Sequence, residues 1–495
     1  MKLLLNLFLI VSLHQTLAAY NVVLIIADDL DSELDGMTPL PMTGELIGNQ
    51  GATFLNSFVA SPICCPNRAS ILTGKYQHNH RTVNNTIAGG CSSPEWQRTF
   101  EPNTFGAYLK REMNYATFYA GKYLNKYGSR EAGGVSHVPA GWDNWFGLVG
   151  NSKYYDYSLS INGREKKYGH NPETDYLTDV IRDFAVKFIN RQRNSQNPFL
   201  MVLAPPAPHS PFLPASRHND KYKGKRAVRT PSFNIGQQKR KHWLVRMGPS
   251  PLPNHILPIL DETYRRRWET LAAVDDLVSK VYTTLKNNNL LNNTYIIFTS
   301  DNGYHIGQFS MPLDKRQPYE TDIKVPLLIR GPGISPTSVI APVSSVDLFD
   351  TILKIAGVEH PSDGVSILSP RVALDRTLLV EYKGEKSKTR PQTGCPSDGD
   401  LNLSYCSSEF ACKCEDVWNN TYACIRRVSP HHNNIFCIFE DDEKYVEAYD
   451  LHEDRYQLDN IGYTMKRNRR HRFRRRLKDM MTCEGSDCVR TGPDT

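Results

Sequence analysis

The chain has 495 residues, of which 40% are hydrophobic, so it can bury a large core and exceeds one average domain of roughly 100–200 residues. Its formal net charge of +7 is modest for this length and gives no support to a nucleic-acid-binding protein. No stretch beyond residue 19 is apolar over the roughly 20 residues of a membrane-spanning helix, which argues against an integral membrane protein.

Residues 1–19 have the pattern of a cleaved secretory signal peptide. Lys2 provides the charged start, residues 3–13 are apolar, and Ala18 and Ala19 supply the small residues at the end. We expect the mature chain to begin near Tyr20 and to enter the secretory pathway. Four Asn-x-Ser/Thr sequons fit a glycosylated product, at Asn84, Asn292, Asn402 and Asn419.

Three apolar runs predict strands buried on both faces, at residues 20–27, 199–204 and 295–299. Helical patterns occupy the intervening and following sequence, at residues 103–113, 174–193, 261–287 and 345–356. Strands that alternate with helices predict an α/β domain with a large, mixed, mostly parallel sheet flanked by helices.

Each predicted strand is followed by polar residues of the kinds that take part in catalysis or bind metal ions. Asp28 and Asp29 follow the first, His209 comes soon after the second, and Asp301 and Asn302 follow the third. Because open α/β sheets place their sites beyond the carboxyl ends of the strands, these side chains point to one shared site.

The sequence changes character beyond about residue 374. Most of the 11 cysteines lie between Cys395 and Cys488, which predicts a disulfide-rich segment whose connectivity the sequence leaves open. We expect a catalytic domain over residues 20–374 and a smaller α+β domain over residues 375–495. Residues 466–478 are densely cationic, which fits a polyanion partner, a solvated basic helix face or a processing site.

Three carboxylates and one amide oxygen form a second pattern. Asp28, Asp29, Asp301 and Asn302 supply hard oxygen ligands of the kind that suit Ca²⁺ or Mg²⁺ better than Zn²⁺. The alternative is that the paired aspartates form an ordinary solvated turn.

The segment from Ser61 to Gly74 contains Cys-x-Pro-x-Arg, formed by Cys64, Pro66 and Arg68, followed by an apolar pair and Thr-Gly. Pro66 fits the first turn of a helix over residues 67–72, which would place Cys64 at a helix N-terminus that favours anions. By themselves, two adjacent cysteines favour a disulfide or buried thiols.

This motif resembles the signature of the sulfatase family. Several further segments resemble its glucosamine-6-sulfatase branch, at residues 64–80, 91–97, 151–155, 175–179, 301–310, 314–317 and 417–424. The resemblance runs nearly from Tyr20 to the end of the chain. Asn67 stands where the branch commonly has Ser, and Leu124 stands where many arylsulfatases have His.

The resemblance implies an alkaline-phosphatase-like fold and a modified nucleophile. Cys64 would be oxidised to formylglycine by the formylglycine-generating enzyme during secretion. One hydroxyl of the hydrated aldehyde would attack sulfur, and the other would then expel sulfate. A single divalent ion, usually Ca²⁺ and less commonly Mg²⁺, would be held by Asp28, Asp29, Asp301 and Asn302 together with residue 64.

The resemblance also implies roles for five further side chains. Arg68 would support the hydrate or the metal ligands, and Lys122, His209 and Lys315 would bind sulfate. One of His209 and Lys315 could protonate the departing sugar oxygen. His305 is a candidate for contact with metal or substrate, and Glu320 for contact with a sugar hydroxyl; a structural role is the alternative for both.

The implied reaction is hydrolysis of 6-O-sulfate esters on N-acetylglucosamine or glucosamine units of heparan sulfate, with keratan sulfate as a second candidate polymer. The implied partner is thus a sulfated glycosaminoglycan, and the implied location is the lysosome or the extracellular space. Alternatives are an endo-acting extracellular 6-O-sulfatase, an arylsulfatase of other specificity, a phosphatase of the same superfamily, and a non-enzymatic glycosaminoglycan-binding protein.

Overall fold

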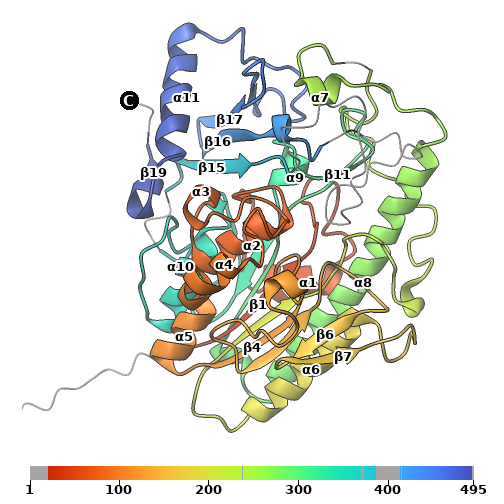
Figure 1. Cartoon of the computed structure of the whole chain (residues 1–495), viewed down its shortest axis with the longest axis vertical. Helices are drawn as coiled ribbons and strands as arrows, with labels where there is room; N and C mark the ends of the chain where they lie inside the picture. Colours follow the sequence, from red (N-terminus) through yellow and green to blue (C-terminus); the bar gives the residue numbers. More distant parts are fainter. Residues whose placement is uncertain (1–19, 237, 370–372, 386–412, 414, 493–495) are drawn as a thin grey trace, which may run out of the picture.

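The computed structural model describes residues 20–236, 238–369, 373–385, 413 and 415–492 (Figure 1). The predicted signal peptide and the sequon at Asn402 lie outside the described residues, as do Cys395, Cys406, Cys412 and Cys414. Within the described residues, no helix combines the length and the apolar character that a membrane span requires.

A ten-stranded sheet forms the centre of the larger part of the molecule. Its spatial order is β13 (Thr337–Val339), β2 (Ala52–Phe54), β12 (Leu327–Arg330), β9 (Thr294–Ser300), β1 (Asn21–Ala27), β8 (Phe199–Ala204), β4 (Ala116–Gly121), β5 (Asn144–Leu148), β6 (Ser158–Ile161) and β7 (Arg164–Lys167). The five strands from β9 to β5 are parallel, whereas β12, β6 and β7 each pair antiparallel with a neighbour. The predicted mixed, mostly parallel sheet is therefore confirmed.

Helices cover both faces of this sheet, which explains the continuous apolar sequence of the central strands. In β1, Val22, Leu24 and Ile26 face a cluster formed with α2 (Cys64–Thr73), α5 (Phe105–Met113) and α10 (Asp347–Ala356). The alternate residues Val23 and Ile25 face α6 (Leu177–Gln192) and the long α8 (Leu257–Asn287) on the opposite side. Side chains alternate along a strand, so one run of apolar residues serves two cores.

The C-terminal part is a smaller antiparallel sheet. Its order is β18 (Val446–Asp450), β17 (His432–Phe439), β16 (Tyr422–Ser429), β15 (Arg376–Tyr382) and β19 (Arg490–Thr491). The helix α11 (Arg467–Met480) packs against it through Phe473, Leu477 and Met480 (Figure 1). Disulfides join Cys424 to Cys437 and Cys483 to Cys488.

The two sheets are joined by a buried apolar interface. Phe58 and Ile63, which precede α2, share one cluster with Tyr382 and Tyr422 of the smaller sheet. A backbone hydrogen bond from the Glu381 amide to the Ala60 carbonyl, at 2.9 Å, adds a polar link. The segment that leads into α2 is thereby held from both sides.

The remaining short elements lie in the connections. They are α1 (Pro41–Thr43), β3 (Ser57–Phe58), α3 (Gln77–His80), α4 (Pro94–Thr99), α7 (Trp243–Arg246), β10 (His305–Ile306), β11 (Leu313–Asp314), α9 (Glu320–Ile323) and β14 (Val343–Ser344).

The predicted helices agree with the observed ones to within about four residues at each end. One difference concerns the helix after the cysteine pair, which begins at Cys64 rather than at residue 67. Pro66 still occupies the first turn, where its missing N–H leaves no intrahelical bond unmade.

Candidate functional site

Four neighbouring strands deliver polar side chains to the same edge of the main sheet. In the order β9, β1, β8 and β4, the residues just beyond their carboxyl ends include Asp301, Asp28, His209 and Lys122. All four residues are buried, and His209 is the most exposed of them. The structure therefore brings these four side chains, each from a different strand end, to one edge of the sheet.

Asp28 is held by a cation and a hydroxyl. Lys122 Nζ donates to both of its carboxylate oxygens, at 3.0 and 2.8 Å, and the Ser152 hydroxyl donates to Oδ2. Burial would raise the pKa of Asp28, but Lys122 and neighbouring cations hold that pKa well below its usual range. Gly121 precedes Lys122 with φ of 110°, and a Cβ there would lie 2.0 Å from the Ala204 carbonyl oxygen. Only glycine lets the chain approach β8 so closely before it turns towards the site.

Asp29 adopts a left-handed backbone conformation, with φ of 69°, that few residues other than glycine tolerate. The turn is fixed by its amide, which donates to Asp301 Oδ1 at 3.0 Å, and by Arg267, which donates to its carbonyl at 2.7 Å. Lys315 Nζ donates to both carboxylate oxygens, at 2.6 and 2.7 Å. Strain of this kind persists only where the surroundings fix the backbone, as they do here.

Asp301 is tied to the helix that starts at Cys64. Arg68 Nε donates to Asp301 Oδ2 at 2.7 Å, and the Asn67 side-chain amide donates to the Asp301 carbonyl at 2.5 Å. Arg68 also donates to the Lys122 carbonyl at 2.7 Å, so α2 fixes two strand ends at once. Burial raises the pKa of Asp301 to about 6, because the charged carboxylate is cut off from water.

Cys64 lies at the first position of α2, fully buried and facing the two aspartates. Its Sγ is 3.7 Å from Asp28 Oδ1 and 3.9 Å from Asp29 Oδ1. It is the one free cysteine among the described residues. Burial raises the pKa of the thiol to about 12, so an unmodified Cys64 would stay protonated and weakly nucleophilic.

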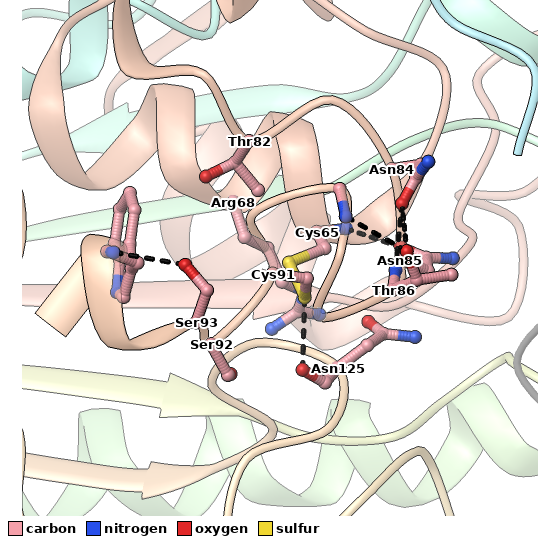
Figure 2. The surroundings of a disulfide bond; sticks show 12 residues. Cys65, Arg68, Thr82, Asn84, Asn85, Thr86, Cys91, Ser92, Ser93 and Asn125 are labelled. Atoms are coloured by element: carbon pink, nitrogen blue, oxygen red, sulfur yellow. Dashed lines mark hydrogen bonds between the residues drawn. A yellow bond between two sulfur atoms is a disulfide. The ribbon is translucent and has the colours of Figure 1, made fainter. Parts of the chain in front are cut away.

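The neighbouring cysteine has a structural role (Figure 2). Cys65 forms a disulfide with Cys91, and its amide donates to Asn85 Oδ1 at 3.0 Å. The Cys91 sulfur lies 3.0 Å from the Asn125 carbonyl oxygen. The bridge thus links the start of α2 to the segment between α3 and α4, and Cys91 in that segment contacts the loop after β4, which carries Lys122. The adjacent thiols of the motif therefore differ: Cys65 is in a disulfide and Cys64 is free.

His209 closes the cluster on its more exposed side. Its Nδ1 donates to the Ser210 carbonyl at 2.7 Å, which leaves Nε2 facing Asp29 Oδ2 at 3.9 Å. Burial and the nearby charge of Lys315 lower the pKa of His209 to about 4. The side chains of His209 and Lys315 are 11% and 6% exposed, against 2% or less for Asp28, Lys122 and Arg68. Access from solvent is therefore on the side of His209 and Lys315.

The residues present fit a divalent cation. Ligand atoms of Asp28, Asp29, Cys64 and His209 all lie within 4.8 Å of one another. Asn302 Oδ1, buried beside them, has no hydrogen-bond partner, while its Nδ2 donates to Asp29 Oδ1 at 2.7 Å. An orphaned buried acceptor among three carboxylates is a costly arrangement that a bound cation would relieve.

The charges also favour an anion beside that cation. The three carboxylates of Asp28, Asp29 and Asp301 are matched by Arg68, Lys122 and Lys315. A divalent ion would leave the cluster with a net charge of about +2, which suits a sulfate group. Arg68 Nη2, buried without a hydrogen-bond partner, is a spare donor for such an anion.

Two predicted substrate residues lie apart from this cluster. His305 is fully buried, with Nδ1 3.0 Å from both Asp322 oxygens and Nε2 3.1 Å from Glu415. Glu320 is paired with Arg426 of β16 at 2.9 Å. Both lie close in sequence to the loops that carry Asn302 and Lys315, and their contact with substrate stays a prediction.

Leu124 and three of the predicted glycosylation sites also lie among the described residues. Leu124, where a histidine was expected from the wider family, is fully buried in the core. Asn292 is exposed, Asn419 is half-buried and Asn84 is 8% exposed. Glycosylation of these three residues stays a prediction.

Sequence reasoning missed Ser152 and Arg267. Ser152 lies in a loop between β5 and β6, and Arg267 lies in the middle of α8, far from any motif. The segment at residues 151–155 was singled out only by resemblance, and nothing local in α8 distinguishes Arg267 from its two preceding arginines. Only the fold brings them to Asp28 and Asp29.

Comparison with known proteins gives consistent results. The profile of the family described as Sulfatase matches residues 20–358. The chain is 48% identical over 478 residues to N-acetylglucosamine-6-sulfatase from Capra hircus, covering 94% of this chain and 84% of that protein. The human protein of the same name is also 48% identical, over 95% of this chain and 86% of its own length. A protein described as a putative extracellular sulfatase Sulf-1 homolog from Caenorhabditis elegans is 38% identical, over 77% of this chain but 52% of its own length.

Solved structures share the fold at low sequence identity. One, described as a complex with its substrate D-glucosamine-2-N,6-O-disulfate, has a TM-score of 0.71 and 20% identity, with 93% of this chain and 97% of that chain covered. A phosphonate monoester hydrolase from Agrobacterium radiobacter has a TM-score of 0.66 and 19% identity, over 93% and 95% of the two chains. The fold alone therefore does not decide between sulfate and phosphonate chemistry.

Proposed function

This chain belongs to the sulfatase family, and we propose that it hydrolyses the 6-O-sulfate ester of N-acetylglucosamine or glucosamine units in heparan sulfate. The 48% identity to N-acetylglucosamine-6-sulfatases over almost the whole chain supports this choice of substrate. Keratan sulfate, which can carry the same sulfated sugar, is the second candidate polymer.

The observation that carries the proposal is the position of Cys64. It is a free, buried residue at a helix N-terminus, faces Asp28 and Asp29 at 3.7 and 3.9 Å, and lies in a cluster flanked by Lys122 and Lys315. With its thiol protonated, residue 64 lacks a nucleophile of its own. Conversion to formylglycine by the formylglycine-generating enzyme would supply a hydroxyl at the same place.

The other side chains of the cluster have different roles in binding sulfate, positioning residue 64 and transferring protons. Lys122 and Lys315 neutralise the sulfate oxygens, and Arg68 holds the Asp301 carboxylate while its free Nη2 points to further anion binding. Asp28 and Asp29 orient residue 64 and hold its hydroxyl protons. Lys315, on the open side, is placed to give a proton to the sugar oxygen as it leaves, whereas His209, whose Nε2 carries no proton, would first have to gain one.

We further propose Ca²⁺ as the cation, held by Asp28, Asp29, Asp301, Asn302 and residue 64. When bound, it supplies Lewis-acid polarisation of a sulfate oxygen. His209 lies within reach of the same ligand atoms, and its neutral Nε2 fits either a metal contact or a substrate contact. An oxygen-rich donor set favours Ca²⁺ over Mg²⁺ because Ca²⁺ accepts more ligands in looser geometry.

The proposed site of action is the lysosome, reached through the secretory pathway, with the extracellular space as the alternative. The signal-peptide pattern of residues 1–19 and the four sequons support this route.

Sulfate release from defined sugars tests the proposal. Protein secreted from cells that make formylglycine should release sulfate from N-acetylglucosamine 6-sulfate and from glucosamine 6-sulfate at the non-reducing end of heparan oligosaccharides. Cys64→Ala should abolish release while the exposed control Asp442→Asn retains it. Preference for internal 6-sulfates would favour an endo-acting enzyme, and preference for a phosphonate monoester would refute the sulfatase assignment of the site.

A further inference from the structure

The helix α11 carries a concentration of positive charge that the proposed reaction does not use. Nine of the chain's 59 lysines and arginines lie in residues 466–478, and the remaining 50 are slightly outnumbered by the 52 aspartates and glutamates. The net positive charge of the chain thus comes from this one short segment. Seven of the nine are arginines, the side chain best suited to paired hydrogen bonds with oxyanions.

One side of α11 is buried, and a separate exposed side is cationic. Phe473, Leu477 and Met480 pack against the C-terminal sheet. At 3.6 residues per turn, Arg467, His471, Arg474 and Lys478 fall in one row, about 120° around the helix from the buried side chains, and all four are exposed. The row extends for about 16 Å along the helix, at 1.5 Å per residue.

This charge is unfavourable for the helix itself. No acidic residue lies in the first turn, although cations there oppose the helix dipole. Asp479 is the single acidic residue of α11, so most cations have like-charged neighbours three or four positions away. An ordinary solvated helix face mixes charges of both signs and gains from such pairs. The retained repulsion is a reason to look for an anionic partner.

The packing of α11 leaves the row of Arg467, His471, Arg474 and Lys478 exposed to solvent, where a partner could contact it. Arg469 lies on the side of α11 towards the sheet, with its Nη2 3.8 Å from Asp450 Oδ2. The exposed Arg467, Arg474 and Lys478 have no acidic group within ion-pair distance among those recorded for the described residues. In Figure 1, α11 stands at one edge of the molecule, with the C-terminal sheet on its inner side.

We infer that the outer face of α11 is a second, non-catalytic binding surface for a sulfated polysaccharide chain. A linear polymer with regularly spaced sulfates matches a linear row of cations in charge and in form. The choice of polymer rests on the proposed function, since a polymeric substrate held at α11 would keep its reactive end near the site. The charge pattern itself is independent of that function.

If α11 anchors the polymer, removing its charges should affect the reaction of polymeric substrates and leave the reaction of monosaccharide substrates unchanged. Because the helix lies on the C-terminal sheet and not among the cluster residues, its charges should affect only substrates long enough to reach both places. Loss of the row should raise KM for the polymer and leave kcat and the monosaccharide reaction unchanged.

The test compares two triple variants of the full chain. Arg467→Gln/Arg474→Gln/Lys478→Gln removes three charges from α11, and Arg164→Gln/Lys167→Gln/Lys187→Gln removes three exposed charges from β7 and α6, at the other end of the molecule (Figure 1). The probe is heparin, with binding measured over a range of salt concentrations. The α11 variant should bind more weakly, and its slope of log affinity against log salt should fall by about two, at roughly 0.7 per charge as for single-stranded polyanions.

The control variant should bind heparin like the unaltered protein, and both should melt at or above its melting temperature because repulsion is relieved or unchanged. Equal heparin binding by both variants would overturn the inference, as would α11-dependent binding to phosphatidylserine vesicles in preference to heparin. If the unaltered protein released no sulfate from N-acetylglucosamine 6-sulfate, the proposed function would fail. A selective loss of heparin binding would still support the α11 surface.

Discussion

Arg68 Nε donates to Asp301 Oδ2 at 2.7 Å, and both side chains are at most 2% exposed. This pair joins the helix that begins at Cys64 to the end of β9. One ion pair therefore sets the distance between the nucleophile position and a proposed metal ligand.

Replacement of Arg68 by Met should destabilise the fold and stop sulfate release. The change leaves a buried carboxylate without its partner, which typically costs about 3–5 kcal/mol. The loss should be smaller with Ca²⁺ present, because the cation compensates Asp301. Thermal unfolding with and without Ca²⁺ measures both effects.

Arg193→Met, at an exposed position after α6, is the matched control and should have little effect. An Arg68→Met protein as stable and as active as its parent would show that the pair does not organise the site.

The disulfide between Cys65 and Cys91 should contribute more to stability than the one between Cys483 and Cys488. The first closes a separation of 26 residues and the second a separation of 5. Loop-closure entropy gives about 3.5 kcal/mol for the first and about 2 kcal/mol for the second. The Cys65→Ala/Cys91→Ala and Cys483→Ala/Cys488→Ala variants, compared by thermal unfolding, test this order.

The two disulfide variants should also differ in sulfatase activity. The first bridge ties the start of α2 to the segment that contacts the loop after β4, so its loss should lower the specific activity of the protein that remains folded. The second is remote and should not. Equal activity in both variants would contradict the positioning role of Cys65.

His78 should make the contact between α3 and the C-terminal part stronger in acid. Its Nδ1 lies 2.9 Å from Glu381 Oε2 and its Nε2 2.9 Å from the Cys483 carbonyl, an arrangement that uses both ring protons. Burial opposes the charge, but the hydrogen bond and charge of Glu381 raise the pKa of His78 above 6.5. The stabilisation is therefore complete below pH 6.5 and is lost as the pH rises through the raised folded value.

Thermal unfolding at pH 5 and pH 8.5 checks the direction. His78→Gln should lose stability relative to its parent at pH 5 and much less at pH 8.5, whereas the exposed control His471→Gln should show little difference at either pH. A larger loss of stability for His78→Gln at pH 8.5 than at pH 5 would contradict this prediction.

Removal of divalent ions should lower both activity and melting temperature, and Ca²⁺ should restore them. A ligand at about 100 times its Kd stabilises the protein that binds it by about 2.7 kcal/mol. Asp301→Asn keeps the size of the side chain but removes a proposed ligand charge, so its melting temperature should no longer respond to Ca²⁺. The exposed control Asp442→Asn should respond normally. Full activity of Asp301→Asn without bound calcium would refute the proposed metal site.

Much of the fold follows from local sequence. The runs of β1, β8 and β9 are apolar throughout because helices cover both faces of the sheet, and the polar residues after them had to meet at one edge. Asp28 and Asp301 could therefore be grouped before the structure was known. The helix after Cys64 was also predictable, because Pro66 fits only its first turn.

Other parts of the site depend on long-range packing. Lys315 reaches Asp29 from a loop far along the chain, and Arg267 reaches the same turn from the middle of a long helix. His305 shares a segment with Asn302 but is enclosed by Asp322 and Glu415, a contact 110 residues away that no local pattern reveals. The partner of Cys65 was likewise undetermined, because adjacent cysteines specify no connectivity.

The central claim is that residue 64 acts as formylglycine and not as cysteine. Mass spectrometry of the peptide that contains residues 64 and 65, from secreted protein that has been reduced and alkylated, tests it directly. We predict alkylation at Cys65 alone and an aldehyde in place of the thiol at residue 64, in proportion to sulfatase activity across preparations. A fully alkylated thiol at residue 64 in active protein would contradict the account.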